Sequence, residues 1–223
     1  MPSKLGPDTS FDQYEDQVIY TRSALRADPD AADLLSGTDG WFARIDAGRA
    51  ADREARVAEG EASAARSVTN GRLDDLGRAL GRELGAALSG DRQSARWRRL
   101  FGGPVDGFVS QPFAAQLSAM KGWLAIAGDA VLDGFRGELE RWTTAADAAV
   151  SATANSAQVR GAGLVAREQL AEDMTRERDG LHARLVARAN ERGLARDWPA
   201  RFFRVAHRRQ GPREPAEPAP AST

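Results

Sequence analysis

The feature that most constrains this chain is a proline-free run from Trp41 to Leu88. Trp41 and Ile45 open an apolar stripe along it, and leucines at spacings of three and four residues continue the stripe at positions 73, 76, 80, 84 and 88. This spacing is that of one face of an α-helix, and proline, which breaks helices, is absent. The run therefore predicts a helix, with Asn70-Gly71 as the place where it would be interrupted.

A second helical pattern follows Pro112 and continues to about Arg192. A single helix of that length would measure about 120 Å, so we expect a break, either at Gly128-Asp129 or within residues 134–137. Alanine, the strongest helix former, occurs 42 times, against 8 Phe and 2 Tyr. The predicted fold is all-α: an elongated antiparallel bundle of long helices.

The Gly- and Pro-containing segments of the sequence predict how the chain is divided. Residues 1–10 are expected to be a disordered lead, and Ser10 is a candidate N-cap for the first helix. Residues 11–101 form a first helical half and residues 112–209 a second, joined by a Gly- and Pro-containing linker loop at 102–111. The Pro-rich residues 210–223 are expected to be a disordered tail.

A shift of 101 residues aligns the two halves with each other. Trp41 meets Trp142 and Trp97 meets Trp198, so four of the five tryptophans pair at one offset. Further identities are Asp46 with Asp147, Gly60 with Gly161, Arg66 with Arg167, Leu80 with Leu181, Leu84 with Leu185 and Phe101 with Phe202. An ancient duplication produces such a pattern, and so does chance matching in an alanine-rich chain.

Each half also contains a stretch that is poor in large apolar residues, at 46–66 and at 145–163. Small side chains let helix axes approach to about 8 Å. We expect both stretches to lie against neighbouring helices.

The charge balance gives the protein no overall attraction to polyanions. The formal net charge is −1, from 31 basic and 32 acidic side chains, so binding to nucleic acid or anionic lipid would need a local basic patch. The chain has no cysteine, no apolar signal segment at its start and no stretch of the ~20 apolar residues that a membrane span needs. We expect a cytoplasmic protein without a bound cofactor.

Motifs for catalysis are sparse. Asp179 and His182 lie one helical turn apart, a spacing that can bind metal, but the further pairs that a di-iron bundle needs are missing. Ser118 and Lys121 match a Ser-x-x-Lys pattern without its partner motifs. We predict no catalytic, metal-binding or cofactor-binding residues, and a protein that is not an enzyme.

The most suggestive feature is a pair of basic, aromatic segments at 92–101 and 196–209, which are equivalent in the repeat. Their candidate partner-binding residues are Arg96, Trp97, Arg99, Trp198, Arg201, Arg204 and Arg208. Arginine and aromatic residues suit protein hot spots and phosphates. Alternatively, the aromatic residues cap the ends of the bundle and the arginines face water or helix C-termini.

The sequence therefore predicts a non-enzymatic helical interaction protein, such as a scaffold, adaptor or assembly component. Its expected partner is another protein or a second copy of itself. The alternative is a nucleic-acid-binding accessory protein that uses the two Arg/Trp segments.

Overall fold

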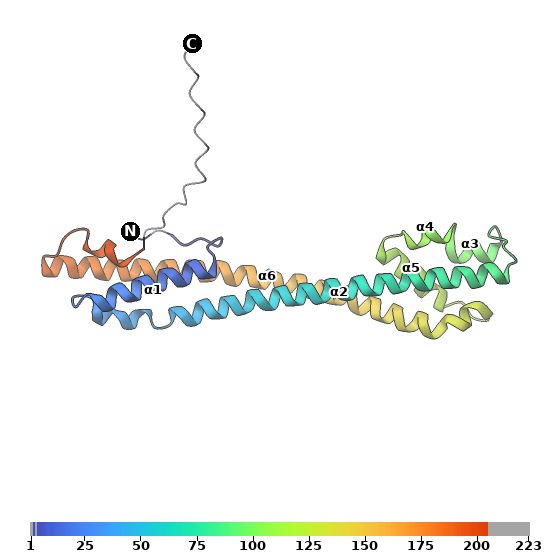
Figure 1. The fold of residues 1–223 in the computed structure, drawn as a ribbon, viewed down its shortest axis with the longest axis horizontal. Helices are drawn as coiled ribbons and strands as arrows, with labels where there is room; N and C mark the ends of the chain where they lie inside the picture. Colours follow the sequence, from blue (N-terminus) through green and yellow to red (C-terminus); the bar gives the residue numbers. More distant parts are fainter. Residues whose placement is uncertain (1, 3, 205–223) are drawn as a thin grey trace, which may run out of the picture. The chain divides into compact units, whose positions relative to one another are not determined.

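A computed structural model describes Pro2 and residues 4–204 of the chain, and these residues confirm the predicted all-α class. No strand occurs among them. The helices, labelled in Figure 1, are α1 (Phe11–Ala27), η1 (Ala32–Thr38), α2 (Trp41–Ala87), α3 (Ala95–Phe101), α4 (Val105–Val109), α5 (Phe113–Leu124), α6 (Ala130–Arg192) and η2 (Trp198–Phe202), where η denotes a 3-10 helix. The predicted tail, 210–223, and Arg208 lie outside the described residues.

The described residues divide into two compact units. Unit 1 combines the described residues up to 50 with those from 165 to 204, and unit 2 is the continuous stretch 51–164. This division differs from the predicted halves 11–101 and 112–209, because each half contributes residues to both units. Both α2 and α6 therefore supply one segment to each unit.

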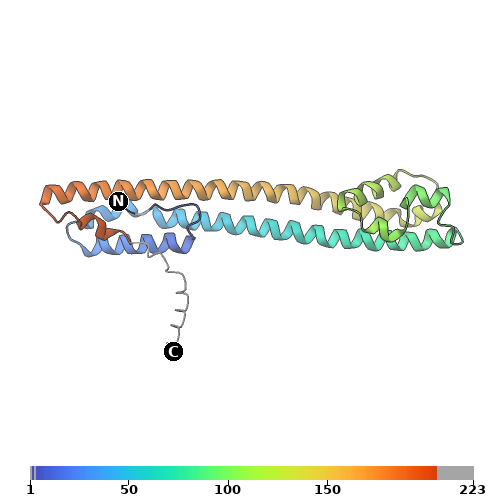
Figure 2. The same cartoon turned by 90° about the horizontal axis from the view of Figure 1, so that it is seen from above.

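Unit 1 begins with a capped helix. The Ser10 hydroxyl accepts a hydrogen bond from the Gln13 backbone N–H (3.2 Å), and the Gln13 side chain accepts one from the Ser10 N–H (2.9 Å). This reciprocal capping box fixes the start of α1 at Phe11, as the sequence predicted. The buried face of α1 joins η1, the start of α2, the end of α6 and η2 in one hydrophobic core. Figure 2 shows these elements lying together.

The predicted disordered lead makes specific contacts in unit 1 over its described part. The Leu5 N–H lies 3.4 Å from the Thr175 hydroxyl, and the buried Tyr14 hydroxyl donates to the Gly6 carbonyl (2.9 Å). Leu5 also packs against the core. An apolar side chain and a phenol that needs a partner hold these residues in place, and the composition of the lead did not indicate this.

The core of unit 2 is aromatic. The rings of Phe101, Phe108 and Trp123 contact one another at centroid distances of 4.9–5.5 Å, and Trp97 lies 5.1 Å from Phe101. Phe108 belongs to α4, so the predicted linker loop 102–111 contains a short helix with a buried residue. α3, α4 and α5 lie together over the parts of α2 and α6 that belong to this core (Figure 1).

Within unit 2, α2 and α6 run antiparallel. Glu59 pairs with Arg160, whereas Arg72, further along α2, lies over the ring of Trp142, earlier in α6. The hydrophobic core of the unit ends at Leu73 on α2 and at Ala146 on α6. Beyond those positions only small or polar residues are buried between the two helices: Ala55, Ala62, Thr69, Ala149 and Ser156.

The predicted interruption at Asn70-Gly71 is wrong, because α2 continues through both residues. Thr69 and Leu73 on either side are buried, and their packing offsets the roughly 1 kcal/mol that glycine costs inside a helix. Of the two predicted break points in the second pattern, Gly128-Asp129 lies between α5 and α6, where Gly128 has φ +74°. Residues 134–137 continue the helix.

A glycine in α2 permits close packing in unit 2. A Cβ added to Gly81 would lie 2.5 Å from Cγ2 of Val105, whereas nothing lies within 4 Å of the same position at Gly60. We expect Gly81→Ala to lower the free energy of unfolding by about 1–3 kcal/mol through overpacking. Gly60→Ala should raise it by about 0.5–1 kcal/mol through helix propensity. Urea unfolding followed by circular dichroism measures both changes. Equal changes in the two variants would contradict the close contact between Gly81 of α2 and Val105 of α4.

Part of the burial pattern repeats at the offset of 101 residues. Residues buried at both members of a pair are Ala31 and Leu132, Thr38 and Leu139, Ile45 and Ala146, Ala55 and Ser156, Thr69 and Leu170, Leu73 and Met174, Gly77 and Arg178, Leu80 and Leu181, Leu84 and Leu185, Trp97 and Trp198, and Phe101 and Phe202. Other buried residues, such as Tyr14, Thr21 and Leu100, have an exposed residue at the equivalent position. Several of these pairs differ in residue type. These equivalent positions therefore share an environment even where the residues of the two halves are not identical.

Candidate functional site

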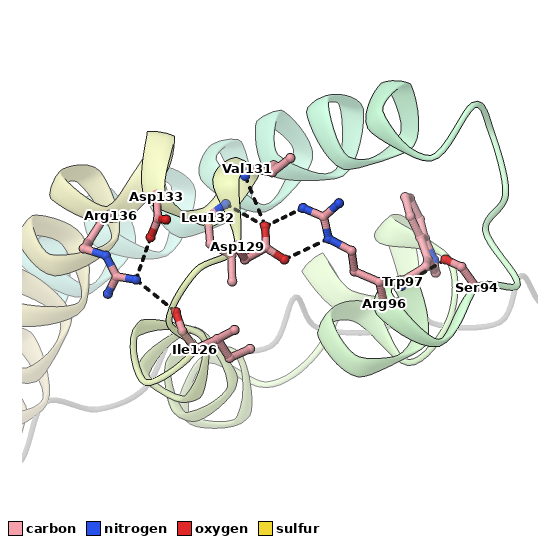
Figure 3. Close-up of polar contacts among 9 residues, drawn as sticks. All are labelled: Ser94, Arg96, Trp97, Ile126, Asp129, Val131, Leu132, Asp133 and Arg136. Carbon is pink, nitrogen blue, oxygen red and sulfur yellow. Dashed lines mark hydrogen bonds and ion pairs between the residues drawn. The ribbon is translucent and has the colours of Figure 1, made fainter.

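The corner between α5 and α6 in unit 2 holds a network of polar contacts (Figure 3). The Asp129 carboxylate accepts two hydrogen bonds from Arg96 of α3, from Nε (2.8 Å) and Nη2 (2.5 Å). It also accepts from the backbone N–H groups of Val131 (3.1 Å) and Leu132 (3.2 Å), and so caps α6. Arg96 therefore has a bidentate carboxylate partner within its own unit.

Arg136 of α6 binds the end of α5 on the other side of the corner. Its guanidinium donates to the carbonyls of Leu124 (2.8 Å) and Ile126 (2.9 Å) and to Asp133 (2.9 Å). Leu124 is the last residue of α5, so Arg136 satisfies carbonyls that the helix end leaves without intrahelical partners. The corner is a structural joint held by two arginines.

An open depression of about 600 Å³ lies beside this corner, and Arg96, Arg99, Ile126 and Asp129 are among its lining residues. Arg99 is exposed at its edge. Because Asp129 neutralises Arg96, the depression has one cation facing water rather than a converging pair. Such an arrangement attracts anions only weakly.

The two candidate tryptophans are core residues. Trp97 is 1% exposed and its indole N–H donates to the Gly103 carbonyl (2.9 Å). Trp198 is 6% exposed and donates to the carboxylate of Asp28 (2.8 Å). Each also contacts the phenylalanine four residues later. With their polar atoms paired and their rings covered, neither presents a face for stacking on a ligand.

Of the candidate arginines in the second segment, Arg201 and Arg204 lie in the described part of the chain, are exposed and have acidic neighbours. Arg201 pairs with Asp197 (3.0 Å), and Arg204 pairs with Asp16 of α1 (3.0 Å). The described candidate residues thus belong to two different units: Arg96, Trp97 and Arg99 to unit 2, and the others to unit 1. Within neither unit do they form a surface of unpaired basic residues around an accessible aromatic ring.

No known protein family, curated protein or solved structure matches this chain. The function of the chain is therefore inferred from its own residues. Of the helices in the described part, none combines the length and the apolarity that crossing a membrane requires.

The residues considered for catalysis lie in ordinary environments. His182 is half-buried beside the ring of Phe203 (5.8 Å), and burial lowers the pKa of its imidazole. Lys121 pairs with Asp147 (2.5 Å), and Ser118 is exposed on the same helix. Among the residues that the structure describes, no three His, Asp or Glu side chains are grouped as a metal site would need.

Sequence reasoning missed a buried cation in unit 1. Arg178 is 1% exposed, donates to Gln17 (3.1 Å) and lies over the ring of Phe203 (5.5 Å). Burial lowers the pKa of its guanidinium. Its position between Met174 and Leu181, at helical spacing, is a signal that the sequence contains, but arginine is rarely fully buried, so the spacing alone does not indicate its burial.

Sequence reasoning also missed an exposed apolar surface in unit 2. Large apolar side chains that remain exposed in the parts of α2 and α6 beyond the hydrophobic core are Val57, Val68, Val150 and Leu164. Val57 and Val150 lie within the stretches 46–66 and 145–163, where the sequence predicted close packing against neighbouring helices, and Val68 and Leu164 lie just beyond them. One face of each segment packs in that way, through Ala55 and Gly163 for example (3.8 Å between the Ala55 Cβ and a Cβ built at Gly163), and another face is open.

The Asp129–Arg96 pair makes the stability of unit 2 depend on pH. The pair with Arg96 holds the pKa of the Asp129 carboxyl below its usual range. Its stabilising effect is therefore complete above the unfolded pKa, about 3.9, and is lost as the pH falls through the lower folded value. We expect Asp129→Asn to lower the free energy of unfolding at pH 7. In strong acid, where the Asp129 carboxyl is itself protonated, this difference from the unmodified protein should disappear. Asp129→Ala should cost about 1 kcal/mol more at every pH, because asparagine retains the helix cap. Thermal unfolding across the acid range checks both.

Proposed function

We propose that this protein is a non-enzymatic helical interaction protein that self-associates and serves as a scaffold or assembly component. The observation that carries the proposal is the exposed apolar surface of unit 2. An isolated pair of helices whose buried side chains are small stabilises itself weakly, because hydrophobic stabilisation scales with the apolar area removed from water. Covering the open face with further helices supplies the missing area.

The nucleic-acid alternative is not favoured by the placement of the Arg/Trp segments. Stacking on bases needs an accessible aromatic face, and phosphate binding needs cations whose charge is available. Trp97 and Trp198 are buried, and Arg96, Arg201 and Arg204 have carboxylate partners. We expect Arg201→Ala/Arg204→Ala to leave retention on immobilised heparin unchanged. A clear loss of retention would restore the alternative.

We further propose that the chain is an internal duplication and that its helices form an antiparallel bundle. Support comes from the part of the burial pattern that coincides at the 101-residue offset even where residue types differ. Each unit combines the start of one long helix with the end of the other, together with a tryptophan-containing segment: η2 in unit 1 and α3 in unit 2. Two copies of an ancestral half that exchanged helices would produce this arrangement.

Co-expression of two differently tagged copies of the chain tests the proposed function. Self-association predicts that purification through one tag recovers the other copy, and that the recovered amount grows with expression level. The matched control is co-expression with an unrelated tagged helical protein. Recovery no greater than that control contradicts the proposal.

A further inference from the structure

Five exposed residues of α6 in unit 2 are small or apolar and lie at heptad spacing. Val150, Ala154, Ala157, Gly161 and Leu164 recur at spacings of four and three residues, and all five are exposed. Residues at this spacing line one side of a helix and form the seam of a coiled coil. We call these five residues the α6 stripe. Val150 and Leu164, its two ends, are 46% and 58% exposed.

Charge is almost absent around the α6 stripe. Residues 148–166 contain a single ionisable side chain, Arg160, and it pairs with Glu59 of α2 (3.1 Å). Exposed helix faces normally have charged residues, as the rest of this chain does. A partner that covers this face meets no unpaired charge on it. An acidic or basic ligand would have to bury its own charge there without a counter-charge, which is costly.

The order of side-chain sizes makes the stripe complementary to itself. It is large at both ends and small in the middle, so a reversal about Ala157 exchanges Val150 with Leu164 and Ala154 with Gly161. A two-fold axis at Ala157 would pack the stripe of one copy against that of an antiparallel second copy. The small central residues allow the helix axes to approach to about 8 Å. Two-fold symmetric association uses the same patch on both partners.

The area of the stripe indicates how strong this contact would be. Its length of helix spans about 22 Å, and a helix is about 10 Å wide. That footprint is smaller than the ~800 Å² per partner of a standard interface. The contact is therefore expected to be reversible and dependent on concentration.

We infer that the α6 stripe is a docking site for a second copy of this chain, packed antiparallel about Ala157. This inference rests on the proposed self-association. The chain has no cysteine, so single cysteines can report the geometry without a background. The test uses the full chain with Ala157→Cys, which should form a disulfide-linked dimer on mild oxidation. Ser151→Cys, exposed on the same helix but off the stripe, is the matched control.

We expect Ala157→Cys to link at least about tenfold faster than Ser151→Cys, because docking raises the effective thiol concentration toward the order of millimolar. Val150→Cys alone should link no faster than the control, whereas an equal mixture of Val150→Cys and Leu164→Cys should link rapidly. If Ala157→Cys fails to fold by circular dichroism, the mixture of Ala154→Cys and Gly161→Cys replaces it.

The outcomes separate this inference from the proposed function. If tagged copies co-purify but Ala157→Cys links no faster than Ser151→Cys, the α6 stripe is not the interface and self-association stands. Faster linkage of Val68→Cys than of Ala157→Cys would place the interface on α2 and overturn the inference in the same way. If copies do not co-purify and none of the variants links, both proposals fail.

Discussion

Trp97→Ala is expected to lower the free energy of unfolding by about 3–5 kcal/mol, the usual cost of removing a buried tryptophan. The ring lies among the aromatic residues of unit 2 and is 1% exposed, and its N–H is bonded to Gly103. Typical domains are stable by only about 5–15 kcal/mol, so this loss is a large fraction of the total. Urea unfolding followed by circular dichroism measures it.

Two further variants control this prediction. Trp198→Ala, at the equivalent position in unit 1, should cost a similar amount. Trp97→Phe retains an aromatic ring but leaves the Gly103 carbonyl without its donor, so about 1–3 kcal/mol is expected. If Trp97 were instead a surface contact residue, Trp97→Ala would change stability by no more than about 0.5 kcal/mol. That result would contradict the burial described above.

The double substitution Val150→Asp/Leu164→Asp is expected to abolish self-association while leaving the fold intact. Each aspartate would have to be buried without a partner in the docked state, and an uncompensated buried charge costs about 3–5 kcal/mol. One such charge weakens the dimer more than about a hundredfold. In the single chain both positions are exposed, so the unfolding temperature should change little. Sedimentation velocity and thermal unfolding measure the two effects.

The matched control is Val57→Asp/Val68→Asp, which places the same charges on exposed valines of α2. We expect this variant to associate as the unmodified protein does. Loss of association in the control alone would assign the interface to α2. Equal loss in both variants would indicate a general effect of charge rather than a contact at the α6 stripe.

Local features of the fold were predictable from the sequence. Ser10 reads as an N-cap because its hydroxyl can satisfy a free N–H of the first turn, and the capping box at Gln13 bears this out. The leucines at 73, 80 and 84 lie at helical spacing and are buried. Both signals depend on interactions within a few residues. Gly128-Asp129 was likewise recognisable, because glycine accommodates the positive φ and aspartate caps the next helix.

What depends on contacts between distant residues could not be predicted. The composition of residues 4–10 indicates disorder, yet Leu5 lies against Thr175. Asn70-Gly71 resembles a helix stop, but packing of the flanking residues outweighs it. The spacing of the α6 stripe is visible in the sequence. Whether its residues are covered depends on where α3, α4 and α5 pack, which no local pattern specifies.

Self-association can be tested with the unmodified protein by measuring its absolute mass by light scattering. A dilution series across roughly 1–100 μM covers the range in which a small interface forms and dissociates. If the chain self-associates, the mass rises with concentration from the 24.0 kDa of one chain toward twice that value. A mass that stays at one chain across the whole series would contradict self-association.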